Sequence, residues 1–255
     1  MPQPVGRHIP LSLPRRFIGD LMHFARQVPS VPVQRRMNLA PVVAARRAAR
    51  PRPSWCAILT KAYGLVSALV PELRRAYLVF PRPHLYEHPV PIASVAVECG
   101  FGGENAVFPL RLRDPGRCSL HNLDRRIRLF KERPIEGFRS VRRLLKVSAL
   151  PWPLRRLLWW AALNLSGPKR AHYLGTFGVS VYGRLGATSL HPLSPLTTTL
   201  NTGVLGEDGS LDVRIVYDHR TLDGATVARA LAELERVLHG AILNELRYLQ
   251  ALEAA

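Results

Sequence analysis

A histidine and an aspartate lie four residues apart in segment 216–225, which reads VYDHRTLDGA. Imidazole has an unperturbed pKa of about 6.5, so His219 can accept a proton near neutral pH and return it. A thiol, with a pKa of about 8.5, is a suitable proton donor to such a base. The spacing therefore predicts general-base catalysis. The structural alternative is that Asp223 only caps a helix and that Gly224 only relieves a tight turn.

The residues around this motif predict a strand, a loop and a helix. Apolar residues alternate with polar ones along 211–217, which is typical of a half-buried strand. Along 225–238 they recur at helical spacing, at Val227, Leu231, Leu234 and Leu238. Asp223 then stands at the N-cap position of the predicted helix.

Further strands and helices are predicted along the rest of the chain. Strands are expected at 31–37, 92–98, 106–112, 175–182 and 197–204. The strands 92–98 and 106–112 are expected to form a hairpin. The segment 80–91, which is rich in Pro and His, is expected to be a loop. Helices are expected at 16–26, 40–50, 54–69 and 119–132, and Ser54 is expected to cap one of them. Helices and strands are interspersed, which favours an α/β (α+β) fold in which a mixed sheet has helices packed on one side.

The composition indicates one large folded domain. The chain has 255 residues, 47% of them hydrophobic, and we expect a catalytic domain over 15–250 after a flexible arm at 1–14. The formal charge of +18 would suit an anionic partner. The arginines are scattered in pairs, which argues against nucleic acid as the main partner. An anionic ligand such as a nucleotide-bearing thioester would also suit this charge. Three widely spaced cysteines predict neither a disulfide framework nor a metal site, and with no signal peptide the expected location is the cytoplasm.

A tryptophan- and arginine-rich segment lies at about 149–166. Its prolines and arginines make it a poor membrane span, because a span needs about twenty consecutive apolar residues. We expect it to pack on the protein itself or on a neighbouring subunit, and peripheral contact with a membrane is the alternative.

Several segments together resemble one family. The Asp-His-Arg-x-x-Asp-Gly-Ala core in 217–230 resembles the catalytic domain of the E2 acyltransferases of 2-oxo acid dehydrogenase complexes and, more distantly, chloramphenicol acetyltransferase. Similar matches are Ile-Leu-Thr-Lys-Ala at 58–62 with Val-Pro-Glu-Leu at 70–73, the Arg-Asp segment in 109–120, and Gly-Thr-Phe-Gly-Val-Ser at 175–180. They follow in family order and cover about 16–246.

The resemblance implies a fold, an activity and roles for individual residues. The fold would be the two-layer sandwich of chloramphenicol acetyltransferase, and the substrate would be CoA or acyl-CoA, without a metal. His219 would be the general base, and Ser180 would donate a hydrogen bond to the oxyanion. Asp223, beside Gly224, would hold the loop by pairing with Arg16. A homotrimer is implied, with each active site between subunits and its histidine and serine on different chains.

The sequence also departs from that family. The sequence shows no lipoyl domain, and Lys61 is predicted on a helix, so Lys61 is not expected to be a lipoyl lysine. A lipoyl-bearing or acyl-carrier partner would be a separate protein. The segment 149–166 is foreign to the E2 pattern. We therefore expect a stand-alone, CoA-dependent acyltransferase acting on a thiol or hydroxyl. The alternative is a catalytically weak or silent subunit that binds a partner complex or a membrane through Trp152, Trp159 and Trp160.

Overall fold

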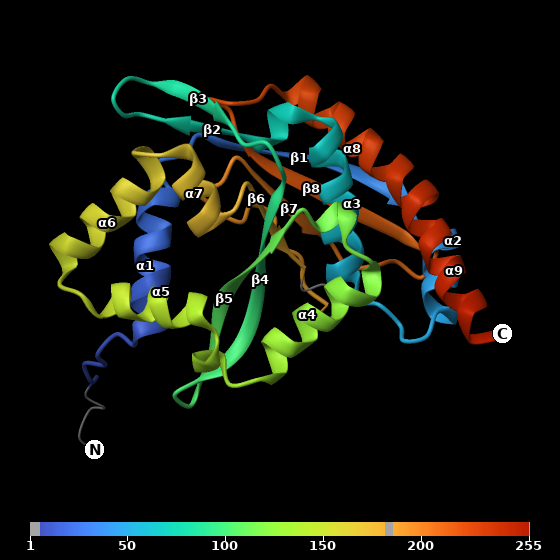
Figure 1. Cartoon of the computed structure of the whole chain (residues 1–255), viewed down its shortest axis with the longest axis horizontal. Helices are drawn as coiled ribbons and strands as arrows, with labels where there is room; N and C mark the ends of the chain where they lie inside the picture. Colours follow the sequence, from blue (N-terminus) through green and yellow to red (C-terminus); the bar gives the residue numbers. More distant parts are fainter. Residues whose placement is uncertain (1–5, 182–185, 255) are drawn as a thin grey trace, which may run out of the picture.

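A six-stranded mixed sheet forms the centre of the computed structural model, which describes residues 6–181 and 186–254 (Figure 1). The strand order is β1-β8-β7-β6-β4-β5. The strands are β1 (Ser30–Asn38), β4 (Ile92–Phe101), β5 (Glu104–Arg113), β6 (Phe177–Ser180), β7 (Thr198–Thr202) and β8 (Ser210–Asp218). Only β6 runs parallel to its neighbours, β4 and β7, while the other pairs in this sheet are antiparallel. The predicted mixed sheet is therefore confirmed.

One layer of helices covers one face of this sheet and encloses the main hydrophobic core. The layer contains α2 (Ala40–Ala48), α3 (Trp55–Leu69), α4 (Leu120–Glu132), α8 (Gly224–Val237) and α9 (Leu243–Ala254), with a π-helical turn at Leu238–Ile242. Tyr63 on α3 and Phe177 on β6 are fully buried and meet edge to face with ring centroids 4.8 Å apart. This layer confirms the predicted helices on one side of the sheet, but that prediction is incomplete, because a second group of helices lies on the other side.

A smaller group of helices lies on the other side of the sheet, at the left of Figure 1. It contains α1 (Leu13–Ala25), α5 (Arg139–Ala149), α6 (Trp152–Asn164) and α7 (Gly167–Leu174). Helix α6 occupies the tryptophan-rich segment and packs on α1 through a small separate core of Phe17, Phe24, Trp159 and Leu163. The buried Asp20 joins the two helices, because its carboxylate lies 2.9 Å from Arg155 Nε and 3.1 Å from Arg156 Nε.

Helix α6, with the residue that follows it, also exposes apolar side chains to solvent. These side chains are Trp152, Leu154, Leu157, Leu158, Trp160 and Leu165. Packing on the protein itself is confirmed for Trp159, while contact of the exposed side chains with another subunit or a membrane stays a prediction. No helix in the described part of the chain is sufficiently long and apolar to traverse a bilayer.

The segment 80–91 was expected to be a loop, and this is wrong for part of it. A two-stranded hairpin joins β2 (Arg75–Leu78) to β3 (His84–Glu87). Each strand has only four residues, so neither is long enough to show a clear alternation, and the turn between them contains Pro81 and Pro83. One-turn 3₁₀ helices lie at Pro71–Arg74, Pro115–Arg117 and Ile135–Gly137.

The observed boundaries differ from the predicted ones mainly at the ends of elements. Helix α1 begins at Leu13, inside the range 1–14 predicted as an arm. Ser54 is an N-cap, as predicted, and accepts a hydrogen bond from the backbone amide of Ala57 at 3.2 Å. Ser119 caps α4 in the same way and accepts from the backbone amide of Asn122 at 3.3 Å. The predicted strand 175–182 is observed as β6, and its last predicted residue lies outside the described residues.

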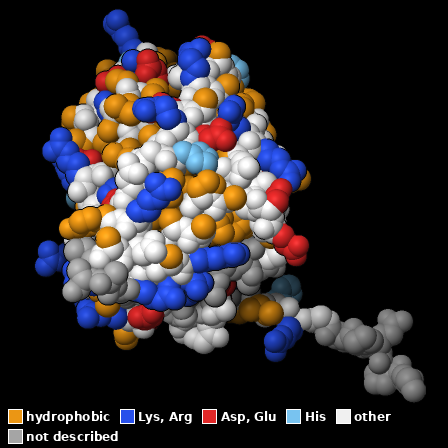
Figure 2. All heavy atoms as spheres, turned by 90° about the vertical axis from the view of Figure 1, so that its right-hand side faces the viewer, with side chains coloured by type: hydrophobic (Ala, Val, Ile, Leu, Met, Phe, Trp, Pro, Cys, Tyr) orange, Lys and Arg blue, Asp and Glu red, His pale blue; other side chains and the backbone are white. Residues whose placement is uncertain are grey.

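Basic side chains are scattered over the face that carries α2, α8 and α9. Figure 2 shows Lys and Arg there among apolar and neutral side chains, without one continuous tract. A nucleic-acid site would gather its cations into a patch or stripe. This face therefore gives no reason to revise the prediction that nucleic acid is not the main partner.

Candidate functional site

His219 is presented to solvent at the point where β8 ends. Its backbone N–H donates to the carbonyl of Pro29 at 3.0 Å, which ties it to the start of β1. The imidazole is exposed, and its ring centroid lies 5.4 Å from that of the buried Tyr217. The sequence motif therefore places the histidine on a backbone held by the sheet, with a ring that a substrate can reach.

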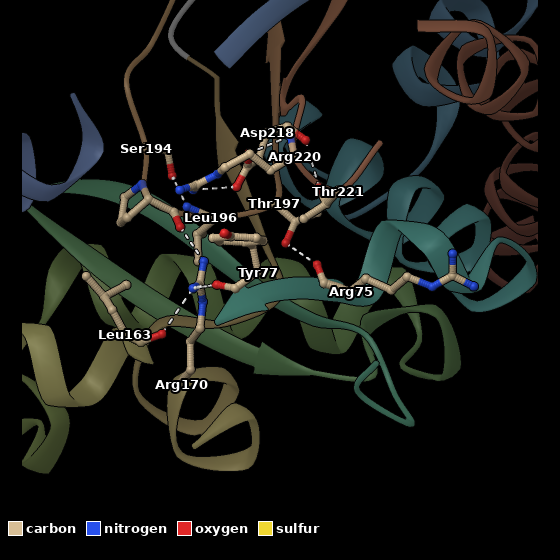
Figure 3. A network of polar contacts seen from close by, with 11 residues as sticks. Arg75, Tyr77, Leu163, Arg170, Ser194, Leu196, Thr197, Asp218, Arg220 and Thr221 are labelled. Atoms are coloured by element: carbon tan, nitrogen blue, oxygen red, sulfur yellow. Dashed lines mark hydrogen bonds and ion pairs between the residues drawn. The ribbon is translucent and has the colours of Figure 1, made fainter. Parts of the chain in front are cut away.

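Asp218 fixes the turn that follows β8. Its fully buried carboxylate binds Arg220 in a bidentate pair, with Nε 2.9 Å from Oδ1 and Nη2 2.8 Å from Oδ2, and also accepts from the Arg220 backbone N–H at 3.0 Å (Figure 3). The Asp218 carbonyl accepts from the hydroxyl of Thr221 at 2.8 Å. The Arg220 guanidinium also lies 4.5 Å from the ring centroid of Tyr77. These contacts on both sides of His219 restrict the loop to one conformation.

Arg170 on α7 connects the end of α6 to β2 and to the segment before β7. It is buried and donates to three backbone carbonyls, those of Tyr77 (2.8 Å), Leu163 (3.1 Å) and Pro195 (2.6 Å) (Figure 3). Burial lowers the pKa of Arg170 to about 10, although the charge of Asp218 acts in the opposite direction. The guanidinium is therefore still charged at neutral pH, beside the Asp218–Arg220 pair.

Asp223 stands at the N-cap of α8, as predicted, but its side chain accepts no capping hydrogen bond. The carboxylate is exposed near Tyr217, and burial together with the Asp223 charge raises the pKa of Tyr217. A Cβ at Gly224 would lie 3.4 Å from the Tyr217 hydroxyl, an ordinary van der Waals contact. Asp223 therefore does not act as the predicted side-chain cap, and packing does not require a glycine at position 224.

The predicted pair between Arg16 and Asp223 is absent among the ion pairs of residues 6–181 and 186–254. Arg16 Nε donates instead to the carbonyl of Leu11 at 3.2 Å. The reason is the position of α1, which packs on α5, α6 and β5, while Asp223 follows β8 near the other edge of the sheet. Within one chain, Arg16 does not support the His219 loop.

Ser180 is the last residue of β6 and lines a large open cleft. The cleft has a volume of about 960 Å³ and lies between the sheet and the helices α1, α5, α6 and α7. Ser180 is half-buried at its wall. The structure thus places the predicted oxyanion donor beside a space that can hold a ligand.

His219 and Ser180 do not meet within one chain. The strand register aligns Ser180 with Asn201 and Asn201 with Arg214, so Ser180 is level with a residue five positions before His219 on β8. At roughly 3.4 Å per residue this offset is about 17 Å along the strands, and the two intervening strand spacings add to it. A site that uses both side chains therefore needs a second copy of the chain.

Sequence reasoning missed three polar residues beside Ser180. Thr199 and Asn201 are buried on β7, and among the described residues neither the Thr199 Oγ1 nor the Asn201 Nδ2 has a hydrogen-bond partner. The buried Arg214 donates to the Asn201 Oδ1 at 3.3 Å and to the Ser189 carbonyl at 2.6 Å. Thr199 and Asn201 lie in the run 197–204 and Arg214 lies in the run 211–217, and each run predicts only a strand. A sequence signal was available, because Thr and Asn are unusual for the middle of a buried sheet.

Two of the three cysteines are unsuited to act as catalytic thiols, and the described residues form no metal-binding cluster. Burial raises the pKa of Cys56 to about 12 and that of Cys99 to about 11, so both thiols stay protonated at neutral pH. No cluster of three or more His, Cys, Asp or Glu side chains suitable for a metal ion occurs among those residues. His219 and Ser180 remain the candidates for the chemistry.

The structure is similar to solved acyltransferases. It matches a probable dihydrolipoamide acetyltransferase from Listeria monocytogenes 4b F2365 with a TM-score of 0.66 and 15% identity, over 92% of this chain and 94% of that one. It matches the dihydrolipoamide acetyltransferase of Azotobacter vinelandii with a TM-score of 0.69 and 17% identity, over 94% and 93% of the two chains. For a chloramphenicol acetyltransferase the values are 0.53 and 13%, over 90% and 96%.

These similarities confirm the predicted chloramphenicol acetyltransferase-like fold. The sequence itself matches no protein-family model and no curated protein. What this chain shares with the solved acyltransferases is therefore its fold, and its chemistry has to be argued from its own residues.

Proposed function

We propose that this chain, which has the fold of E2 catalytic cores and chloramphenicol acetyltransferase, is an acyltransferase that moves an acyl group between CoA and a thiol or hydroxyl acceptor. The observation that carries the proposal is the exposed imidazole of His219 on a turn fixed by the buried Asp218. Further support comes from Ser180, which lines a cleft large enough for a substrate. The study of the Azotobacter vinelandii enzyme likewise concerns a serine and a histidine in its catalytic mechanism.

The reaction follows from the properties of these two side chains. His219 accepts the proton of the acceptor thiol or hydroxyl, and the acceptor S or O atom forms a bond to the thioester carbonyl carbon. The Ser180 hydroxyl donates to the negatively charged oxygen of the tetrahedral intermediate. The C–S bond to CoA then breaks, and the protonated His219 returns its proton to the departing thiolate. Asp218 holds the turn through its pair with Arg220.

The proposed active site is formed by two copies of the chain. The offset between His219 and Ser180 along the sheet excludes a single-chain site, so His219 of one copy would face Ser180 of another. A closed ring of three copies would repeat this contact three times, in line with the trimer implied by the sequence resemblance. One of the similar structures is the cubic core of the pyruvate dehydrogenase multienzyme complex, in which such chains form a larger assembly.

The central experiment measures thiol release from acyl-CoA in the presence of thiol and hydroxyl acceptors. His219→Ala should lower kcat by about 10²-fold or more, because general acid–base catalysis contributes about that much. His121→Ala is the matched control, since His121 is exposed on α4 and has no proposed role. Equal rates for the wild type and His219→Ala would overturn the proposal.

A further inference from the structure

The cleft beside Ser180 is far larger than an acetyl group requires. Its volume of about 960 Å³ lies at the upper end of the range of about 300–1,000 Å³ that is typical of ligand pockets. Apolar side chains from three elements form much of its wall, including Phe17 and Leu21 on α1, Leu144 on α5, and Leu158 on α6. Such a wall favours an apolar ligand, because burial of apolar surface is favourable in proportion to its area.

Cations without acidic partners surround this apolar space. Arg111, Arg139, Arg143 and Lys169 line the cleft, and no Asp or Glu is found among its described lining residues. In the described part of the chain, none of the four forms an ion pair with a carboxylate. Arg111 is half-buried and donates to the Tyr173 carbonyl at 2.7 Å, and the Arg143 guanidinium lies 5.7 Å from the Tyr173 ring centroid. The rim therefore favours an anionic group.

Unpartnered polar groups lie at the Ser180 end of the cleft. Thr199 also lines the cleft, is 6% exposed, and its hydroxyl makes no hydrogen bond to a residue that the structure describes. Asn201, the register partner of Ser180, is fully buried behind this lining, and its Nδ2 has no partner within 6–181 and 186–254. A buried polar group without a partner costs free energy. A polar ligand atom at this end, such as a thioester carbonyl oxygen, would supply the missing partner.

We infer that the cleft binds a long apolar acyl chain carried on an anionic thioester, as in a long-chain fatty acyl-CoA. The chain lies among α1, α5 and α6, the thioester lies near Ser180 and Thr199, and the phosphates pair with Arg139, Arg143 and Lys169. This inference rests on the proposed function, because it names the acyl donor of that reaction. It concerns binding, so it is tested without turnover.

The first test compares chain lengths and blocks the cleft. In calorimetry with the His219→Ala protein, palmitoyl-CoA should bind at least about tenfold more tightly than acetyl-CoA. Burial of only a few methylene groups is enough to supply this difference in affinity. Ala96 is exposed on β4 and lines the cleft, so Ala96→Trp should remove this preference. Ala228→Trp, at an exposed position of α8, is the matched control and should retain it. Equal affinity for the two ligands, or an unchanged preference in Ala96→Trp, would overturn the inference.

The second test concerns the anionic end and does not depend on the folding of Ala96→Trp. Arg139 and Arg143 are both exposed on α5, so the double variant Arg139→Gln/Arg143→Gln should fold and should weaken palmitoyl-CoA binding about tenfold or more. Arg247→Gln, an exposed position on α9, should leave it unchanged. Palmitate that binds as tightly as palmitoyl-CoA would contradict the thioester. If His219→Ala turns over normally while binding behaves as expected, the proposed function fails and the chain-binding site stands.

Discussion

Asp218 controls the position of His219 without touching a substrate. Its carboxylate is fully buried and is held by both Nε and Nη2 of Arg220, one residue beyond the histidine. The position of His219 directly after a strand could be predicted from its local sequence, because the strand and the motif are adjacent in the chain. The contacts of Asp218 could not, since they depend on burial and on the pairing of its backbone with Ser30 and Thr197, which are distant or separate in the sequence.

Asp218→Asn should lower kcat by roughly 10- to 100-fold while leaving the KM for acyl-CoA unchanged. The amide keeps the size of the side chain but loses the bidentate ion pair, so the loop moves, and a misplacement of about 1 Å is enough for such a loss. Steady-state kinetics with separate kcat and KM values checks this. Asp212→Asn is the control, because Asp212 lies half-buried on the same strand. A purely structural role would lower the melting temperature without this selective effect on kcat.

At the scale of elements, a predicted strand or helix was correct where one face of it is buried in the main core. β8 and α8 have an unambiguous period because Val213, Ile215, Leu231 and Leu234 all face the same core. Helix α5 is not predicted from the sequence. Its segment is rich in arginine, and its helical periodicity rests on few buried apolar residues, Val141 and Leu145. The sequence could not give the register that separates Ser180 from His219, because it depends on pairing between strands far apart in the chain.

Asp20 holds α6 on α1, and its removal should destabilise this pair of helices. Asp20→Asn leaves Arg155 and Arg156 without a carboxylate, and the loss of one partner from a buried pair costs about 3 kcal/mol. We expect the free energy of unfolding in urea to fall by about this amount. Asp208→Asn, at an exposed loop position, should have no measurable effect. An unchanged urea midpoint in Asp20→Asn would show that the ion pairs contribute nothing net.

At the scale of the whole molecule, the open question is how copies of the chain combine. One chain cannot bring His219 to Ser180, whereas an assembly can do so at each contact between copies. Neither the number of copies nor their arrangement follows from the sequence of one chain, because a symmetric interface depends on the final shape of the surface.

Two inactive variants should restore activity when they are assembled together. In a mixture of His219→Ala and Ser180→Ala, some contacts pair an intact histidine with an intact serine. Random mixing in a closed ring gives about a quarter of the wild-type sites. The experiment unfolds and refolds equal amounts of the two variants together and measures thiol release, with each variant refolded alone as the control. A mixture no more active than the separate variants would contradict a site shared between copies.

The two hydrophobic cores of this chain differ greatly in size, and this has a consequence for its dynamics. The cluster that joins α6 to α1 contains four buried residues, whereas the main core includes residues from the sheet and from six helices. Regions with few buried contacts open locally at lower free energy than the global transition. Backbone amides of α6 should therefore exchange with deuterium before those of β8 and α3. The cleft could then admit and release a long ligand by transient detachment of one wall, while the sheet that carries Ser180 and His219 stays folded.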